Sequence, residues 1–290
     1  MREGLTAPDS LVDLRGISKS AEVTWHDDGS ALVGASARLA HLARDARLRE
    51  AYPLLAEACE AVGSEAIRTM GTLGGNLCQR VRCGYFRHGF DCLKRGGDRC
   101  SARDGENQYH AIFFDPGSSE GSCAAVHPSD PAIALTALEA TVHVSGAAGT
   151  RDIAIADFFT GTASGEDGET ALAPGEIVTG VTIPAYSRGG RQRYEKVIQR
   201  GAFDFALVSL AALKRADGEV RLVLGGVALR PWRVTDSIEE DVASGGLSDD
   251  DIETLGARAL YDARPLEKNG YKVDMASALL RRGIAFLEGR

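Results

Sequence analysis

One long segment without hydrophobic periodicity constrains the fold of this chain more than any other feature. From Gly71 to Ser129 the sequence is rich first in glycine and then in cysteine and arginine, and four of the six cysteines lie between Cys83 and Cys123. An irregular segment of this length in a compact domain is usually functional or disordered, and its cysteines and aromatic residues argue against disorder. We therefore expect something other than a hydrophobic core to order it.

The spacing of these four cysteines indicates a metal centre. They are separated by nine, eight and 23 positions, and the amino end shows no secretion signal that would favour disulfides. A 4Fe-4S cluster binds four thiolates, and nearby cations offset its negative charge. Zinc usually takes C-x(2-4)-C knuckles, which this segment lacks, so we favour an iron-sulfur cluster over zinc and over unliganded thiols. The candidate ligands are Cys83, Cys92, Cys100 and Cys123, and the candidate cations are Arg82, Arg87, Lys94, Arg95 and Arg99.

The remaining two cysteines are interpreted as structural. Cys59 lies on the apolar face of a predicted helix, where a buried cysteine acts as a small hydrophobic residue. Cys78 stands five residues before Cys83 and is a further ligand candidate, but a cubane takes four thiolates. His127, close to Cys123, is expected to be a hydrogen-bond partner of the cluster rather than a ligand.

A glycine-rich loop, TMGTLGGNLCQ, precedes the cysteines. Glycines let the backbone approach a ligand closely, and successive amides with a threonine hydroxyl can cradle a pyrophosphate or a flavin edge. Such a string is also common in ordinary turns, so both interpretations remain open at this point. The residues concerned are Thr72, Gly74, Gly75 and Asn76.

The flanking sequence predicts an α+β fold with two domains. Strands are expected in SLVDLRGI, AEVTWHDDGSALVGA, ATVHVSG, GEIVTGVTIP, FALVSLAALKRA and EVRLVLGGVAL, with strand and turn pieces at 153–159. Helices are expected at 31–48, 51–62, 249–263 and 274–287 and in PAIALTALEA. A polar AYSRGGRQ run divides a domain of residues 1–186, with the cysteine insertion at about 78–124, from a domain of residues 187–290.

Composition excludes two classes of partner. The net charge of −8 comes from interspersed charges, so no basic stripe is available for nucleic acid. No stretch approaches the roughly 18 apolar residues that a membrane helix needs, so we expect no membrane insertion.

Several motifs together resemble a known family. TLGGNL, HPSDPAIALTALEA, GEIVTGVTIP and YEKVIQRGAFDFALVSLAA are similar to the FAD-binding medium subunits of the xanthine dehydrogenase and carbon monoxide dehydrogenase family, over almost the whole chain. The resemblance implies a PCMH-type FAD-binding domain followed by a carbon monoxide dehydrogenase flavoprotein-like domain of antiparallel strands and helices. The cysteine insertion resembles that of 4-hydroxybenzoyl-CoA reductase and periplasmic aldehyde oxidoreductase, which implies a 4Fe-4S cluster on the four cysteines named above.

The resemblance also implies flavin contacts. Thr72, Gly74, Gly75 and Asn76 would contact FAD, Asp130 would accept hydrogen bonds from its ribityl or ribose hydroxyls, Ile177 would pack on the isoalloxazine, and Lys196 would lie near the ring. Each residue also has a structural alternative: Asp130 as a helix cap, Ile177 as part of the core and Lys196 as a solvated charge.

The family's usual amino-terminal βαβ subdomain, with an A-G-G-T-[DN] loop for the FAD pyrophosphate, is expected to be largely absent from this chain. A late start, a truncation or a separate chain would account for that. The expected function is an electron-transfer subunit of a molybdenum hydroxylase, with a molybdopterin-binding large subunit and a 2Fe-2S small subunit as partners. It is expected to be cytoplasmic, or periplasmic by co-export. The alternative is a non-catalytic assembly subunit, stabilised by a cluster or by zinc, without FAD.

Overall fold

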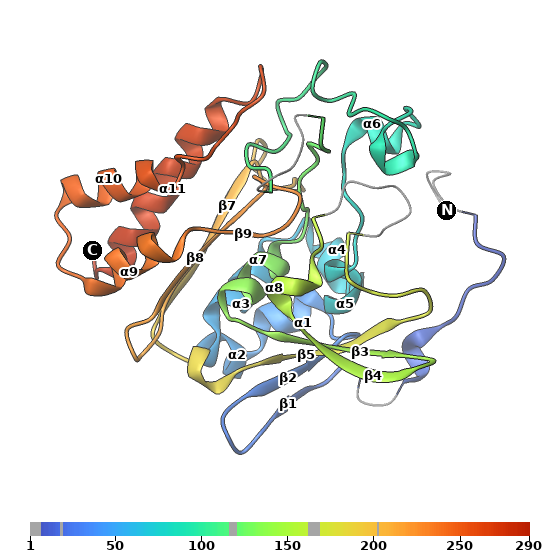
Figure 1. Ribbon diagram of the computed structural model, residues 1–290. Helices are drawn as coiled ribbons and strands as arrows, with labels where there is room; N and C mark the ends of the chain where they lie inside the picture. The colour runs from blue at the N-terminus through green and yellow to red at the C-terminus, as the bar shows by residue number, and fades with distance from the viewer. Residues whose placement is uncertain (1–6, 18–19, 116–120, 162–168, 202) are drawn as a thin grey trace.

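A computed structural model describes residues 7–17, 20–115, 121–161, 169–201 and 203–290, which form two antiparallel sheets and a set of helices (Figure 1). The predicted α+β class is confirmed. The strands are β1 (Val23–Trp25), β2 (Ala31–Gly34), β3 (Thr141–Gly146), β4 (Gly149–Ala154), β5 (Ile177–Ile183), β6 (Arg191–Val197), β7 (Val208–Lys214), β8 (Val220–Gly225) and β9 (Trp232–Arg233). The helices are α1 (Leu39–Arg44), α2 (Ala46–Ala51), α3 (Pro53–Glu60), α4 (Glu65–Met70), α5 (Leu73–Leu77), α6 (Gly84–Arg87), α7 (Asp130–Ala137), α8 (Ile155–Phe158), α9 (Asp236–Ser244), α10 (Asp249–Arg258) and α11 (Tyr271–Leu287). No helix in the described ranges is both long enough and apolar enough to cross a membrane.

The first sheet has the strand order β1-β2-β5-β3-β4. Ala31 and Val33 of β2 are fully buried whereas Leu32 between them is not, the alternation of a strand with one face on the core. That core also contains the apolar faces of α1, α3, α5 and α7. The sheet therefore supports the helices that carry the glycine loop and the Ser129-Asp130 motif.

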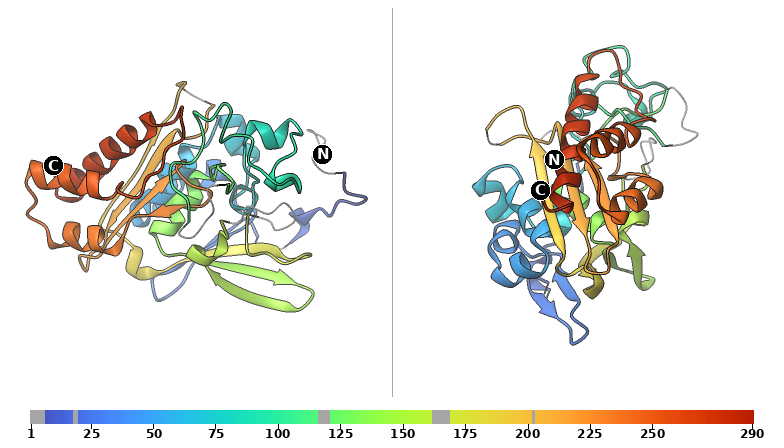
Figure 2. Two further views of the ribbon diagram at one scale, coloured as in Figure 1. Left: turned by 45° about the horizontal axis from the view of Figure 1, so that its top comes forward. Right: turned by 90° about the vertical axis from the view of Figure 1, so that its left-hand side faces the viewer.

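The second sheet, β6-β7-β8-β9, is buried on both faces (Figure 2). Helices α9 and α11 cover one face, and α3 and α7 cover the other. Successive residues of β7 alternate between two cores: Ala211 and Leu213 face α3 and α7, whereas Leu210 and Ala212 face the carboxy-terminal helices. This double burial explains why the β7 sequence is an almost continuous apolar run.

Helix α11 lies close against the second sheet. Its buried residues Ala276, Leu280, Ile284 and Leu287 recur at helical spacing, which gives one apolar face. A Cβ atom at Gly283 would lie 2.5 Å from the Leu210 side chain, so a glycine there permits the close contact with β7.

The segment that carries the four candidate ligands, residues 78–125 and called the cysteine segment below, lies at one end of the molecule in its described part (Figure 1). It contains α6 and a 3-10 turn at Leu93–Arg95, and its small core consists of Val81, Phe86, Cys92 and Ala125. A core of this size is too small to order such a segment, so other contacts must contribute.

Some predicted elements were wrong or missed. The hairpin and helix predictions overlapped at 31–35, and the hairpin is confirmed there because β2 pairs with both β1 and β5. SLVDLRGI forms no strand in its described residues and contains a 3-10 turn at Leu14–Gly16. Strand β6 was missed because its residues are mostly polar, and β9 and α9 were also missed. The strand expected at 153–159 was wrong beyond Ala154, where β4 ends and the short helix α8 begins. The predicted loop between β4 and β5 lies partly outside the described residues, and the domain boundary after residue 186 stays a prediction.

Candidate functional site

The four cysteines predicted to bind a cluster line one small cavity of about 20 Å³. Cys83 immediately precedes α6, and Cys92 immediately precedes the 3-10 turn at Leu93–Arg95, so two short helices direct two of the thiols. Cys59 and Cys78 lie outside this cavity. The fold thus brings together thiols that are up to 40 positions apart and separates them from the two cysteines interpreted as structural.

Two of these thiols influence each other directly. A hydrogen bond between the Cys100 and Cys123 side chains lowers the pKa of Cys100 to about 6, and the same contact, together with burial, raises the pKa of Cys123. Burial raises the pKa of Cys83. Metal ligands are thiolates, so those of the four cysteines that are protonated would release their protons when a metal binds.

A buried lysine faces the same cavity. The Lys94 side chain is 1% exposed, and its Nζ lies 3.3 Å from Oε1 of Glu169, whose Oε2 is 2.5 Å from Nε of Arg80. The Lys94 charge favours the thiolate form of Cys123. Of the five cations predicted to offset a cluster's charge, Lys94 is the one that lines the cysteine cavity.

A histidine that the sequence analysis did not single out contacts a candidate ligand. Nε2 of His110 lies 3.3 Å from Sγ of Cys83, and the ring is buried. Burial and, secondarily, the nearby Lys272 ammonium lower the pKa of His110 to about 4. No sequence signal pointed to this residue, which follows Cys83 by 27 positions in an irregular stretch.

Within the described residues, no group of three or more His, Cys, Asp or Glu side chains could hold a single metal ion. In a 4Fe-4S cubane each thiolate binds a different iron, so the ligands surround the cluster rather than meet at one point. A site for a 4Fe-4S cluster therefore need not bring three ligands within reach of one ion.

The glycine loop forms the start of α5 and packs against the first sheet. Thr72 caps the helix by accepting a hydrogen bond from the Gly75 amide at 3.2 Å, and the Gly74 amide donates to Ala35 O at 2.8 Å. A Cβ atom at Gly74 would lie 2.9 Å from the Ala35 Cβ, so packing alone requires this glycine. The amides of Gly74 and Gly75 therefore both have partners within the protein. Gly75 is nevertheless exposed at the surface, and the Thr72 hydroxyl can still donate a hydrogen bond.

The glycine loop is joined to the Ser129-Asp130 motif. The Ser129 hydroxyl donates to Oδ1 of Asn76 at 2.6 Å and accepts from the Ala132 amide at 3.1 Å, so Ser129, not Asp130, caps α7. The fold therefore places these two sequence motifs in direct contact although they are 53 positions apart.

Asp130 and Lys196 form a buried ion pair. Oδ2 of Asp130 accepts from Nζ of Lys196 at 2.8 Å, Oδ1 accepts from the Tyr194 hydroxyl at 2.6 Å, and Lys196 also donates to Ala61 O. Burial raises the pKa of Asp130, and the Lys196 ammonium opposes that shift. A carboxylate has about four lone-pair positions, so Asp130 retains capacity for a further donor. Ile177, by contrast, begins β5 and pairs with Ser145 of β3.

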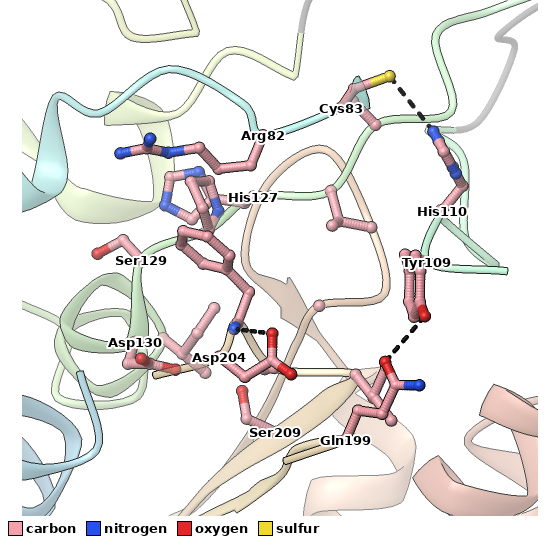
Figure 3. Close-up of a pocket in the computed structure, with 18 of the residues that line it drawn as sticks. Arg82, Cys83, Tyr109, His110, His127, Ser129, Asp130, Gln199, Asp204 and Ser209 are labelled. Carbon is pink, nitrogen blue, oxygen red and sulfur yellow. Dashed lines mark hydrogen bonds between the residues drawn. The ribbon is translucent and has the colours of Figure 1, made fainter. Parts of the chain in front are cut away.

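A larger cavity of about 350 Å³ lies between the cysteine segment and the start of α7 (Figure 3). Cys83, His110, Ser129 and Asp130 line it. Residues 199–200 and 204–207 of the segment between β6 and β7 line it as well. Figure 3 shows the His110 contact with Cys83 at one end of this cavity and Asp130 toward the other. Among the residues predicted to contact FAD, Asp130 lines this cavity.

His127 has a different environment from the one expected. It lines the larger cavity and packs on the Phe159 ring at 4.5 Å between centroids, and burial lowers its pKa to about 3. Neither ring nitrogen has a hydrogen-bond partner among the described residues. The hydrogen bond to a cysteine comes from His110 instead.

Comparison with known proteins identifies the class. Residues 1–186 match the family described as the FAD binding domain in molybdopterin dehydrogenase, and the chain belongs to this family of FAD-binding medium subunits of xanthine and carbon monoxide dehydrogenases. The predicted family is confirmed.

Among its relatives, the aldehyde oxidoreductase FAD-binding subunit PaoB of Escherichia coli is 38% identical over 98% of this chain and 86% of its own length. The glyceraldehyde dehydrogenase medium chain of Sulfolobus acidocaldarius is 25% identical over 89% of this chain and 74% of its own length. Quinoline 2-oxidoreductase from Pseudomonas putida 86 shares the fold with a TM-score of 0.72 at 20% identity, covering 99% of this chain and 84% of that one. The chain is therefore a member of an oxidoreductase family.

Proposed function

We propose that this chain is the flavin and iron-sulfur electron-transfer subunit of a molybdenum-containing hydroxylase or aldehyde oxidoreductase. In this proposal it holds FAD and a 4Fe-4S cluster and passes electrons from the clusters of partner subunits, through FAD, to an external acceptor. Its partners are a molybdopterin-binding large subunit, where the substrate is oxidised, and a 2Fe-2S small subunit. The chain positions its cofactors and sets their surroundings, while the cofactors carry the electrons.

The observation that carries the proposal is the convergence of four cysteines on one cavity beside a buried lysine. Cys83, Cys92, Cys100 and Cys123 come from four separate places in a segment with little core. A cluster held by all four would cross-link that segment and supply the order that its apolar residues cannot. Lys94 lines this cavity and its charge favours the Cys123 thiolate, so it would offset part of the cluster's negative charge even though its ammonium also pairs with Glu169.

Anaerobic purification followed by iron, sulfide and zinc analysis tests the cluster. We expect four irons and four sulfides per chain and a broad visible absorption band. Replacing Cys83, Cys92, Cys100 or Cys123 by serine should each lower the iron content, because serine removes a thiolate ligand.

The matched control is Cys78→Ser, which changes a nearby cysteine outside the cavity and should leave the iron content unchanged. Zinc in place of iron in the wild-type chain would refute the redox function. Loss of iron from Cys78→Ser, with iron retained in one of the four cavity variants, would refute the ligand set.

The fit to FAD rests on the surface formed by the glycine loop and α7. Exposed Gly75 allows close approach, the Thr72 hydroxyl is available as a donor, and Asp130 can accept one more hydrogen bond. When bound, the flavin supplies transfer between one-electron and two-electron carriers. Flavin release by acid, followed by fluorescence, measures its content.

A second candidate is an assembly subunit without FAD. It is favoured by the internal hydrogen bonds of the Gly74 and Gly75 amides, which leave no open amide nest for a pyrophosphate in this loop. Stoichiometric FAD in the purified complex would exclude this candidate, and four irons without FAD would favour it.

Partners and location are tested together. We propose that the chain acts in the cytoplasm, or in the periplasm after export with a partner. Tagged chain should co-purify with one molybdopterin-containing and one 2Fe-2S-containing subunit, and cell fractionation of that complex shows which compartment contains it. Recovery of the chain alone from both fractions would contradict the proposed complex.

A further inference from the structure

Residues 264–272, which lead into and begin α11, hold the backbone around His110 in place. Asn269 donates from Nδ2 to the carbonyls of His110 at 3.1 Å and Ala111 at 3.0 Å, and Nζ of Lys272 donates to His110 O at 2.8 Å. Asn269 and Lys272 are fully buried. The backbone at His110 is therefore fixed by two buried side chains from a distant part of the chain.

Neighbouring contacts extend this attachment. The Arg264 amide donates to Ile112 O at 2.7 Å, the Lys268 amide donates to Oδ1 of Asn107 at 2.9 Å, and the Tyr271 hydroxyl donates to Gln108 O at 2.7 Å. The attachment thus covers the residues on both sides of His110 and fixes the backbone that carries its ring. The Tyr85 ring lies beside the imidazole, with 6.2 Å between the two centroids.

The His110 ring points its Nε2 atom at the sulfur of Cys83. Its Nε2 lies 3.3 Å from Cys83 Sγ, while Nδ1 is buried and has no hydrogen-bond partner among the described residues. A neutral imidazole has one N–H, so the tautomer with the proton on Nε2 would donate to a Cys83 thiolate, whereas the other tautomer would accept from a Cys83 thiol. A cysteine that binds iron is a thiolate, so Nε2 is the donor when a cluster is held. His110 lines the larger cavity and does not line the cysteine cavity, whereas Cys83 lines both. Figure 3 shows the His110 ring beside Cys83 in the larger cavity.

We propose that His110 is a positioning residue that donates an Nε2–H hydrogen bond to the Cys83 thiolate and raises the reduction potential of the cluster. This inference rests on the 4Fe-4S cluster of the proposed function. A hydrogen bond to a ligand sulfur stabilises the more negative, reduced cluster, and such bonds are among the factors that set iron-sulfur potentials. One such bond is expected to change the equilibrium constant for reduction about tenfold, which corresponds to about 59 mV for one electron.

Redox titration of the purified wild-type chain and three variants, followed by electron paramagnetic resonance, tests this role. His110→Leu removes the hydrogen-bond donor and should lower the reduction potential of the cluster by about 59 mV, the shift that corresponds to the tenfold change in the equilibrium constant. His110→Gln retains a side-chain N–H and should lie between the two. The matched control, His88→Leu, changes an exposed histidine of the same segment whose Nδ1 contacts the Gly84 carbonyl rather than a sulfur, and it should not shift the potential.

Iron analysis of each protein separates the two levels of proposal. A wild-type chain without iron refutes the proposed cluster and the inference with it. Four irons in wild type and His110→Leu with equal potentials refute the inference alone. If His110→Leu does not fold, wild-type protein labelled with ¹⁵N-histidine provides a second test. Pulsed electron paramagnetic resonance should detect ¹⁵N coupled to the reduced cluster in wild type, and this coupling should be lost in labelled His110→Gln. Absence of the coupling in wild type refutes the hydrogen bond.

Discussion

Replacement of Asp130 by alanine should destabilise the junction between α7 and β6 by about 3–5 kcal/mol, the cost of leaving one member of a buried ion pair without its partner. The side chains of Asp130 and Lys196 are each 7% exposed, and after the replacement Lys196 would retain, among the described residues, its hydrogen bond to Ala61 O. For a chain of this size that loss corresponds to a fall of roughly 6–10 °C in the melting temperature.

Thermal unfolding of the two single variants and the double variant measures the interaction. Lys196→Met should cost less than Asp130→Ala, because burial already raises the pKa of Asp130 and the carboxyl can take up a proton. The double variant should cost less than the sum of the single variants by about 0.5–3 kcal/mol. Glu65→Ala, in an exposed pair with Arg44, is the control and should show no measurable change. Strict additivity, or a melting temperature for Asp130→Ala equal to that of the control, would refute the buried pair.

Two further outcomes are expected. Gly74→Ala should cost about 1–3 kcal/mol in denaturant unfolding, because its Cβ would lie 2.9 Å from that of Ala35. Gly201→Ala, with open space at its Cβ, should be neutral, and equal effects would contradict the close packing of α5 on the residue that follows β2. Burial lowers the pKa of Lys272 to about 7 from 10.5, so the unfolded state binds more protons than the folded state between these values. Wild-type stability should therefore rise relative to Lys272→Met by up to about 1.4 kcal/mol per pH unit from pH 7 toward 10.5, and parallel curves for the two proteins would rule out the shifted pKa.

Local patterns predicted several elements correctly. The apolar PAIALTALEA run forms α7, which is buried all round, and the alternation in GEIVTGVTIP forms β5. These predictions succeeded because an apolar run or a period of two reflects burial that neighbouring residues share. Strand β6 escaped because its Arg, Gln, Glu and Lys residues obscure the pattern at the edge of a sheet.

The candidate site was also predictable from the sequence only in part. The four cysteines could be selected from composition, spacing and family resemblance, since thiols are scarce and their chemistry is distinctive. The partners of Asp130 could not, because Lys196 and Tyr194 lie 66 and 64 positions away and nothing local marks them as its neighbours.

The sequence by itself thus determined the family, the α+β class and the identity of the candidate thiols. Only the tertiary structure decided which side chains surround them: Lys94 at the cysteine cavity, His110 on Cys83, and Asn269 and Lys272 on His110. The physical reason is that hydrophobic periodicity reports burial along one element, whereas hydrogen bonds and ion pairs depend on the distances between elements, which are set when the two sheets and α11 pack together.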